Sequence, residues 1–362
     1  MVTVSEELVR ERGFQMSVTI KDVAKLANVA PSTVSRVISN SPRISEKTKR
    51  KVRKVMDELN YHPNLNARSL ANSSTKSIGV VLSPTVNTSF QNPFFAEVIR
   101  GITSYINQKD YSLYFITGKN EEEIAQLVNK TVKGGRVDGI ILLYSKENDP
   151  IIQYLNSHDY PFVLVGKPFS HLEEITYIDN DNYSASREVT NYLLSLGHKN
   201  IAFVGGEKNL LVTKERLRGY EDALKLNGLP IIDEFSIFTS FTREGGMNSV
   251  DQLLRNDHEP TAMIVTDDIL ALGVISALKN KGFSVPEHIS VVSFNNALIA
   301  ELATPPLTSV DINIYQLGYE AAKNIIYKVE EPDGSEKSII VPYKLIIRDT
   351  CSINNVRKLI ES

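Results

Sequence analysis

The stretch VTIKDVAKLANVAPSTVSRVISN, residues 18–40, decides the architecture of the N-terminal part of this chain. Thr19 can cap a helix, with Asp22 three residues later in a capping-box arrangement. The apolar residues at 20, 23, 24 and 27 then share one helical face. Asn28 marks the end of this helix, because asparagine tolerates the left-handed conformation that a tight turn needs. Pro31 is typical of the first turn of a second helix.

The residues that follow complete a helix-turn-helix unit. Val34, Val37 and Ile38 form the buried stripe of the second helix, while its serine, threonine and arginine side chains point mostly outward. Two short helices joined by a tight turn are typical of this unit. Ser45 can cap a third helix, and the other faces of that helix carry a set of cations: Lys47, Lys49, Arg50, Lys51, Arg53 and Lys54. We expect phosphate contact for one or two of these cations and solvation for the rest.

Charge separates this segment from the rest of the chain. Residues 17–76 hold twelve Lys and Arg against four Asp and Glu, a net +8, so the remainder carries −11 of the total charge of −3. A basic head on an acidic body favours a polyanionic partner, although a solvated basic face gives the same balance.

At this point the sequence resembles the LacI/GalR repressor family. The resemblance rests on residues 18–40 and on Asn60-Tyr-His-Pro-Asn64, which follows the third helix. It implies that the second helix enters the major groove of DNA, with Pro31, Ser32 and Arg36 at base-reading positions. It also implies phosphate contact or turn support at four positions, each of which has a purely structural alternative: Thr19, Thr33, Ser35 and Asn40. Asn28 replaces the usual glycine of the turn and Ala30 the usual serine, which puts the docking near Ala30 in doubt.

Residues 64–76 are rich in Asn and Ser and read as a hinge. The segment can form one or two helical turns, too few for a stable helix alone. In the family it folds on DNA, pairs with its dimer mate and inserts a leucine into the minor groove. Asn64, Ala67 and Leu70 match this hinge, and Leu70 matches the inserted leucine. The alternative is a plain linker with Leu70 packed on the body.

From residue 77 the pattern changes to alternating strands and helices. Short apolar runs predict strands at 78–83, 112–117, 138–143, 162–165, 201–204, 262–265 and 289–293. Helical spacing is found in stretches such as 95–107, 121–133, 183–196, 214–226 and 269–280. This alternation predicts parallel sheets covered on both faces, which bind ligands beyond the carboxyl ends of their strands.

The body resembles the effector core of the same family, which is similar to periplasmic sugar-binding proteins with two Rossmann-like lobes. The resemblance runs from residue 78 to about residue 348 and includes Asn92-Pro-Phe-Phe, Arg216-Leu-Arg-Gly-Tyr220 and Asp267-Asp268. It implies a sugar site, because polar groups that take two hydroxyls and an aromatic ring face are what a sugar requires. By position, the effector-binding residues are Ser83, Phe94, Lys167, Arg216, Phe241, Asp267 and Asn295.

Several of these residues have a plainer interpretation. Phe94 and Phe241 can be core residues, and Lys167 can be a surface lysine. Asn295 departs from the acidic residue common at its position, which argues for altered sugar specificity. Together, Val165-Gly-Lys-Pro and Asn295-Asn296 resemble the maltose repressors of Gram-positive bacteria. Maltose or a maltodextrin is therefore the expected effector.

Other functional classes find little support. The chain has no dinucleotide, Walker or nucleophile-elbow motif and no paired metal-ligand histidines, so we expect no enzyme, cofactor or metal site. One cysteine, Cys351, excludes an intrachain disulfide, and no apolar run approaches the roughly 18 residues of a membrane span. We therefore expect a cytoplasmic protein. Two alternatives stay open: a regulator controlled by a phosphoprotein corepressor, and a sugar-acting α/β enzyme.

The expected organisation is an all-α helix-turn-helix head at 17–63, a hinge at 64–76, an α/β core at 77–352 and a tail at 353–362. The first lobe is expected at about 77–179 plus 311–330, and the second at about 180–310 plus 338–352. Residues 1–16 form an extension, and we hypothesise that translation starts at Met16. A homodimer is expected on a near-palindromic operator in double-stranded DNA, because one head covers only a half-site.

Overall fold

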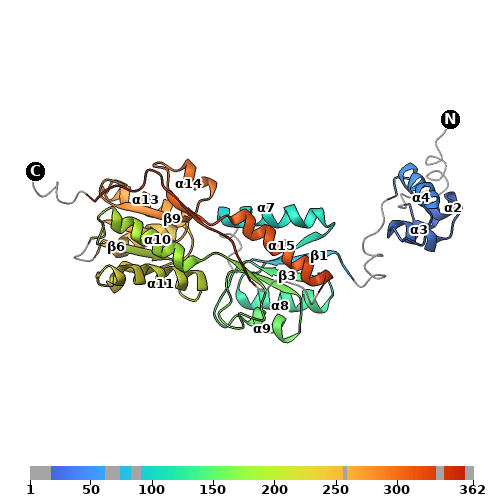
Figure 1. The fold of residues 1–362 in the computed structure, drawn as a ribbon, viewed down its shortest axis with the longest axis horizontal. Helices are drawn as coiled ribbons and strands as arrows, with labels where there is room; N and C mark the ends of the chain where they lie inside the picture. The colour runs from blue at the N-terminus through green and yellow to red at the C-terminus, as the bar shows by residue number, and fades with distance from the viewer. Residues whose placement is uncertain (1–17, 62–73, 83–90, 256–258, 332–337, 355–362) are drawn as a thin grey trace, which may run out of the picture. The chain divides into compact units, whose positions relative to one another are not determined.

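The computed structural model describes residues 18–61, 74–82, 91–255, 259–331 and 338–354 (Figure 1). Tertiary contacts divide the chain into two compact units, with the boundary between Thr75 and Lys76. We call the first unit the head and the second the core. Among the helices of the described residues, none has the length and apolar composition of a membrane span.

The head consists of the predicted helices α2 (Ile20–Leu26), α3 (Pro31–Ile38) and α4 (Glu46–Glu58). The Asp22 carboxylate accepts hydrogen bonds from both the backbone N–H and the hydroxyl of Thr19, which confirms the predicted start of α2. Asn28 has φ +48°, as the predicted tight turn requires. The three helices meet over a small buried cluster of Val23, Ala24, Ala27, Val34, Val37, Val52 and Leu59.

The first sheet of the core has six strands in the order β11-β5-β4-β3-β1-β2, all parallel. Their bounds are β1 Ser77–Val81, β2 Ser112–Ile116, β3 Gly139–Leu142, β4 Phe162–Val165, β5 Tyr177–Asp179 and β11 Ser338–Ile340. The helices of this lobe are α7 (Pro93–Gln108), α8 (Glu121–Lys133), α9 (Pro150–Ser157) and α15 (Ile314–Glu330). Strands β3 and β4 are buried along their whole length, as strands covered on both faces should be.

The second sheet has the order β12-β10-β9-β8-β6-β7, parallel except for β12, which runs antiparallel to β10. Its strands are β6 Ile201–Gly205, β7 Ser236–Phe238, β8 Ala262–Val265, β9 Ser290–Asn295, β10 Thr308–Asp311 and β12 Lys344–Ile346. Its helices are α10 (Asn182–Ser195), α11 (Leu211–Leu226), α12 (Arg243–Leu253), α13 (Asp268–Asn280) and α14 (Leu298–Leu302), with a short 3₁₀ turn at Asp233–Phe235. Two doubly wound lobes are therefore present, as predicted.

Helices α7 and α15 lie side by side over the first sheet (Figure 1). Their close approach depends on two glycines. A Cβ atom on Gly101 would lie 2.1 Å from the Tyr315 carbonyl oxygen, and one on Gly318 would lie 2.1 Å from the Val98 carbonyl oxygen. Any side chain at either position would push the two helices apart.

In the described core, the chain crosses between the lobes after β5, after β10 and after β11. One expected boundary was wrong at the last crossing. Residues 338–352 were assigned to the second lobe, but β11 pairs with β5 in the first sheet, and only β12 joins the second. A three-residue strand is too short to show a periodicity that would reveal its sheet.

Candidate nucleic-acid interface and effector site

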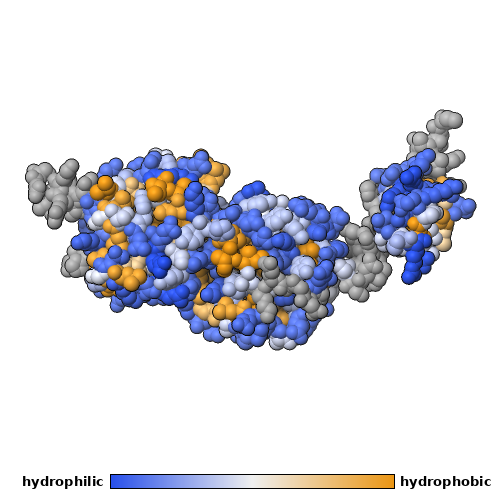
Figure 2. Space-filling model, viewed as in Figure 1, coloured by the Kyte–Doolittle hydropathy of each residue, from blue (hydrophilic) through white to orange (hydrophobic). Residues whose placement is uncertain are grey.

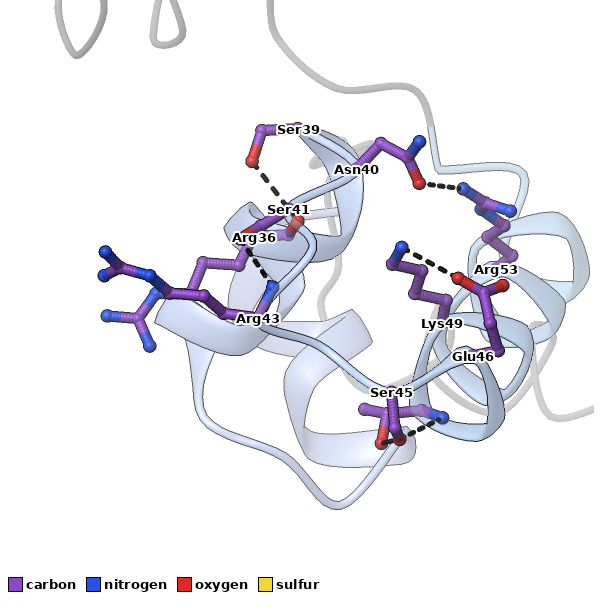
Figure 3. Close-up of polar contacts among 10 residues, drawn as sticks. Arg36, Ser39, Asn40, Ser41, Arg43, Ser45, Glu46, Lys49 and Arg53 are labelled. Atoms are coloured by element: carbon purple, nitrogen blue, oxygen red, sulfur yellow. Dashed lines mark hydrogen bonds and ion pairs between the residues drawn. The ribbon is translucent and has the colours of Figure 1, made fainter.

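One face of α3 is available for a ligand. Pro31, Ser32, Ser35 and Arg36 are exposed, and Thr33 is half-buried, while Val34 and Val37 fill the core of the head. Figure 3 shows the Arg36 and Arg43 guanidinium groups extending to the same side of the head, away from Asn40 and Arg53. This face therefore presents hydroxyls and cations, the groups that contact phosphates and base edges.

Asn40 ends α3 with a positive φ of +52°, and its side-chain oxygen accepts a hydrogen bond of 3.1 Å from Arg53 Nη2. Arg53 lies on α4, so this contact joins the turn after α3 to the third helix (Figure 3). The sequence pattern predicts Arg53 only as one of the outward cations of α4. Its contact with Asn40 depends on the packing of the two helices, which the sequence pattern does not give.

Lys49 does not belong to the outward cations that we expected on α4. Only 6% of its surface is exposed, and its ammonium group lies 2.8 Å from the Glu46 carboxylate. The hydrogen bond from Lys49 holds the pKa of Glu46 below its usual value. The other cations of the expected set are exposed, and the visible surface of the head is mostly hydrophilic (Figure 2).

Arg216, on α11, is the central cation of the core site. Only 4% of its surface is exposed. Its Nε donates to the Asn182 side-chain oxygen at 2.9 Å, and Nη1 donates to the Thr266 carbonyl at 2.8 Å. The guanidinium carbon also lies 4.1 Å from the centre of the Phe294 ring. Burial lowers the pKa of Arg216 to about 10, and the carboxylates of Asp179, Asp267 and Asp268 oppose that shift, so the group stays a cation at neutral pH.

Asp267 caps α13 and faces groups from both lobes. One carboxylate oxygen accepts from the backbone N–H groups of Ile269 and Leu270, which fixes the side chain at the helix start. The other oxygen accepts from Asn295 at 2.8 Å and from Asn92 at 2.9 Å. Asn92 begins α7 of the first lobe, so this contact crosses between the lobes. Burial raises the pKa of Asp267.

Asp179, at the end of β5, extends the cluster into the first lobe. It accepts hydrogen bonds from the Lys167 backbone N–H and from the Asn182 side chain, at 3.0 and 2.9 Å. Burial raises its pKa to about 6. Lys167, an expected effector-binding residue by position, thus contributes its backbone N–H to this contact.

Asp268 is adjacent to Asp267 in sequence but has a different environment. One of its oxygens accepts from the hydroxyls of Ser293 and Ser309, and the other from the Ala297 backbone N–H. Burial raises its pKa to about 7. These bonds tie α13 to β9 and β10, so Asp268 organises the second lobe.

The two aromatic candidates pack against protein groups. The Phe241 ring lies against Gly206, where an added Cβ would fall 2.1 Å from the ring. Gly206 directly follows β6, so Phe241 sits at the carboxyl edge of the second sheet. Phe94 is half-buried against the hydrophobic core and meets Phe95 edge to face at 5.3 Å.

The hydrogen bonds form two neighbouring groups, one of Asp267 with Asn295 and Asn92, and one of Arg216 with Asn182 and Asp179. Arg216 also donates to the carbonyl of Thr266, the residue before Asp267. Asn92, Asn182 and Asp179 were not predicted as site residues, although Asn92 begins a motif quoted above. Four predicted positions lie outside the described residues: Asn64, Ala67, Leu70 and Ser83.

Two sequence profiles match the chain. Residues 19–64 match the family described as bacterial regulatory proteins, lacI family, and residues 190–351 match the periplasmic binding protein-like domain. The transcriptional regulator MalR of Streptococcus pneumoniae is 42% identical over 326 residues, which cover 89% of this chain and 96% of that protein.

Solved structures agree in fold. A transcriptional regulator from Bacillus cereus is 53% identical with a TM-score of 0.75, covering 77% of this chain and 99% of that one. A maltose operon transcriptional repressor of Staphylococcus is 32% identical with a TM-score of 0.69, covering 76% and 98%. The lac repressor dimer bound to operator and an anti-inducer is 27% identical with a TM-score of 0.80, covering 93% and 100%.

Proposed function

Because the chain belongs to the lacI family of bacterial regulatory proteins, we propose that it represses transcription from an operator under the control of maltose or a maltodextrin. Membership of this family makes it a DNA-binding transcriptional regulator and not an enzyme. Since its target is bacterial DNA, we propose that it acts in the cytoplasm.

We propose that α3 reads the operator. Arg36 is exposed and can donate two parallel hydrogen bonds to a guanine, with Pro31 and Ser32 at neighbouring base edges. Thr33, Ser35 and the Asn40–Arg53 pair would hold the head against the phosphates. Two copies would bind two half-sites, as the lac repressor dimer does on its operator.

The observation that carries the effector proposal is that the buried Arg216 guanidinium group has N–H donors left for a ligand. A guanidinium group has five N–H donors, and two of them bond within the described part of the chain. A buried cation with donors left for a ligand is suited to neighbouring hydroxyls of a sugar. Asp267 and Asn295 supply acceptors beside it, and a sugar hydroxyl can replace the Asn92 amide at Asp267.

Maltose is favoured over other sugars by two observations. The 42% identical relative from Streptococcus pneumoniae is the regulator MalR, and the Staphylococcus structure is of a maltose operon repressor. Asn295 lies at the end of β9, and its side-chain amide donates a hydrogen bond to Asp267. An amide both donates and accepts, so it suits hydroxyls in more than one orientation.

Operator binding measured by fluorescence anisotropy, with maltose, maltotriose, cellobiose or glucose added, tests the proposal. We expect maltose or maltotriose to change operator affinity at least tenfold. Arg216→Ala should abolish this response and leave sugar-free operator affinity within twofold. The matched control is Lys225→Ala, which removes an exposed cation from the same helix and should respond normally. Operator affinity that ignores every sugar but rises with a phosphorylated protein would replace this proposal with the corepressor alternative.

A further inference from the structure

Two loops of the core form a short β-bridge between the lobes. Lys146, after β3 in the first lobe, pairs antiparallel with Leu210, after β6 in the second. The Glu147 N–H donates to the Asn209 carbonyl at 3.1 Å, and the Leu211 N–H donates to the Ser145 carbonyl at 3.2 Å. We call residues 145–147 with 209–211 the interlobe bridge.

Side chains reinforce the interlobe bridge. The Lys214 ammonium lies 2.5 Å from the Glu147 carboxylate and 4.8 Å from the centre of the Phe169 ring. Lys214 belongs to the second lobe, whereas Glu147 and Phe169 belong to the first. Lys146 in turn pairs with Glu121, at the start of α8, which anchors the first-lobe loop to its own lobe.

The sheet order places this bridge away from the chain crossings. The crossings follow β5, β11 and β10, at one edge of each sheet. The bridge follows β3 and β6, which lie farther from that edge than β5 and β9, which end at Asp179 and Asn295, and than β8, which precedes Asp267. Asp179, Asn295 and Asp267 therefore lie between the covalent crossings on one side and the interlobe bridge on the other.

We infer that the interlobe bridge holds the lobes closed over the effector and that Lys214 and Glu147 are positioning residues that set how long the sugar stays bound. The part that concerns the sugar rests on the function proposed above. A ligand held between two lobes leaves when they separate, so each contact that must break first slows its release. An exposed ion pair contributes about a two- to fivefold factor, because such pairs are weak in water.

A charge exchange tests the ion pair. Glu147→Lys and Lys214→Glu each place like charges together and should speed the exchange of the Leu211 and Glu147 amides, measured by hydrogen–deuterium exchange of peptides covering 143–149 and 207–213. The double variant Glu147→Lys/Lys214→Glu restores opposite charges and should return both amides toward wild-type protection. This readout needs no sugar, so it judges the bridge independently of the proposed function.

Maltose release tests the consequence for binding. Stopped-flow tyrosine fluorescence should show dissociation about two- to fivefold faster in each single variant and restored in the double variant. If wild-type protein fails to bind maltose, the proposed effector is wrong, and the exchange experiment still judges the bridge. If wild-type binds but all variants release maltose at the wild-type rate, the bridge has no role in retention and the proposed effector stands.

A backbone variant provides a second test. Leu211 is the first residue of α11, where proline is tolerated, and Leu210 before it is extended with φ −83° and ψ 133°, as a residue before proline should be. Leu211→Pro removes the N–H that bonds to Ser145, while Leu211→Ala keeps it. We expect faster maltose release in Leu211→Pro than in Leu211→Ala, by about two- to tenfold, the range for one hydrogen bond. Equal rates in the two variants, at equal melting temperatures, would overturn the inference.

Discussion

The head and the core present their polar functional groups in opposite ways. In the head, Arg36, Ser32 and Ser35 stand exposed on one short helix, and their positions follow from a local helical repeat. In the core, Arg216 and Asp267 are buried, and each bonds to residues far away in the sequence. A surface that reads a large polyanion needs free groups, whereas a site that encloses a small molecule needs groups held in place beforehand. We therefore expect substitutions on the exposed face of the head to change DNA binding without changing stability, and substitutions of buried polar residues in the core to change the free energy of unfolding as well.

The largest expected effect is on the stability of the core. Asp268→Ala leaves the Ser293 and Ser309 hydroxyls and the Ala297 N–H without their acceptor in a buried position. We expect the free energy of unfolding to fall by about 3 kcal/mol, measured by urea denaturation. Glu287→Ala, at an exposed position of the same lobe, is the control and should change it by less than about 0.5 kcal/mol. An unchanged midpoint for Asp268→Ala would contradict the assignment of Asp268 as an organising residue.

In the head, replacing an exposed residue of α3 should change operator binding without changing stability. Arg36→Ala should weaken operator binding by about 1–3 kcal/mol, the range for a bidentate arginine–guanine contact, with no change in the melting of the head. Lys51→Ala removes the same charge from an exposed position of α4, and we expect it to weaken specific and non-specific binding alike. Both variants are measured by anisotropy on operator and random DNA. If Arg36→Ala, like Lys51→Ala, weakened binding to the two DNAs by the same factor, Arg36 would contact only phosphate.

The next effect is the dependence of the stability of the core on pH. Burial raises the folded-state pKa of Asp179 to about 6 and of Asp268 to about 7, both above the unfolded value of 3.8. The folded core therefore binds protons more tightly than the unfolded chain. This contribution to stability is complete below pH 3.8 and is lost as the pH rises toward 7. Urea denaturation should show the core about 2 kcal/mol less stable at pH 6 than at pH 5, with a flatter profile in Asp268→Asn. A profile that rises across this range would refute the assigned shifts.

The smallest expected effect concerns the turn of the head. Asn28→Ala places a Cβ-bearing residue without a stabilising amide at φ +48°, which should cost about 1 kcal/mol. Asn28→Gly should be neutral or slightly stabilising, because glycine adopts this conformation freely. Thermal melting followed at the helices of the head measures both variants. Equal melting temperatures would mean that the turn tolerates a shift in its backbone.

The head could be predicted from sequence almost completely, because its helices, its turn and its exposed face depend on neighbours within a few residues. The seven core strands predicted from apolar runs are also present. Helix α15 is absent from our predicted stretches although its buried positions repeat at helical spacing, so the signal existed. Strand β10 carries buried Thr308 and Ser309 and for that reason does not read as an apolar run.

The candidate site was predictable only in part. Asp267 and Asp268 are adjacent and chemically identical, and only the fold shows that one faces the other lobe while the other faces Ser293 and Ser309. Asn182 and Asp179 join Arg216 through contacts that no local pattern encodes. The effector residues named from the sequence remain predictions until binding is measured.

The route of the chain between the lobes bears on biosynthesis. A nascent chain that has reached residue 311 carries most strands of both sheets, yet α15 and β11 of the first lobe and β12 of the second have still to be made. Helix α15 packs on β3, β4 and β5 of the first lobe, and in the second lobe the Val291 N–H donates to the Thr350 carbonyl. Neither lobe can therefore complete its folding until the last part of the sequence has been made. A ribosome that stalls in this region would leave two unfinished lobes with open apolar faces. Such a product should be an early substrate for chaperones and proteases, and it could not act as a partly functional regulator.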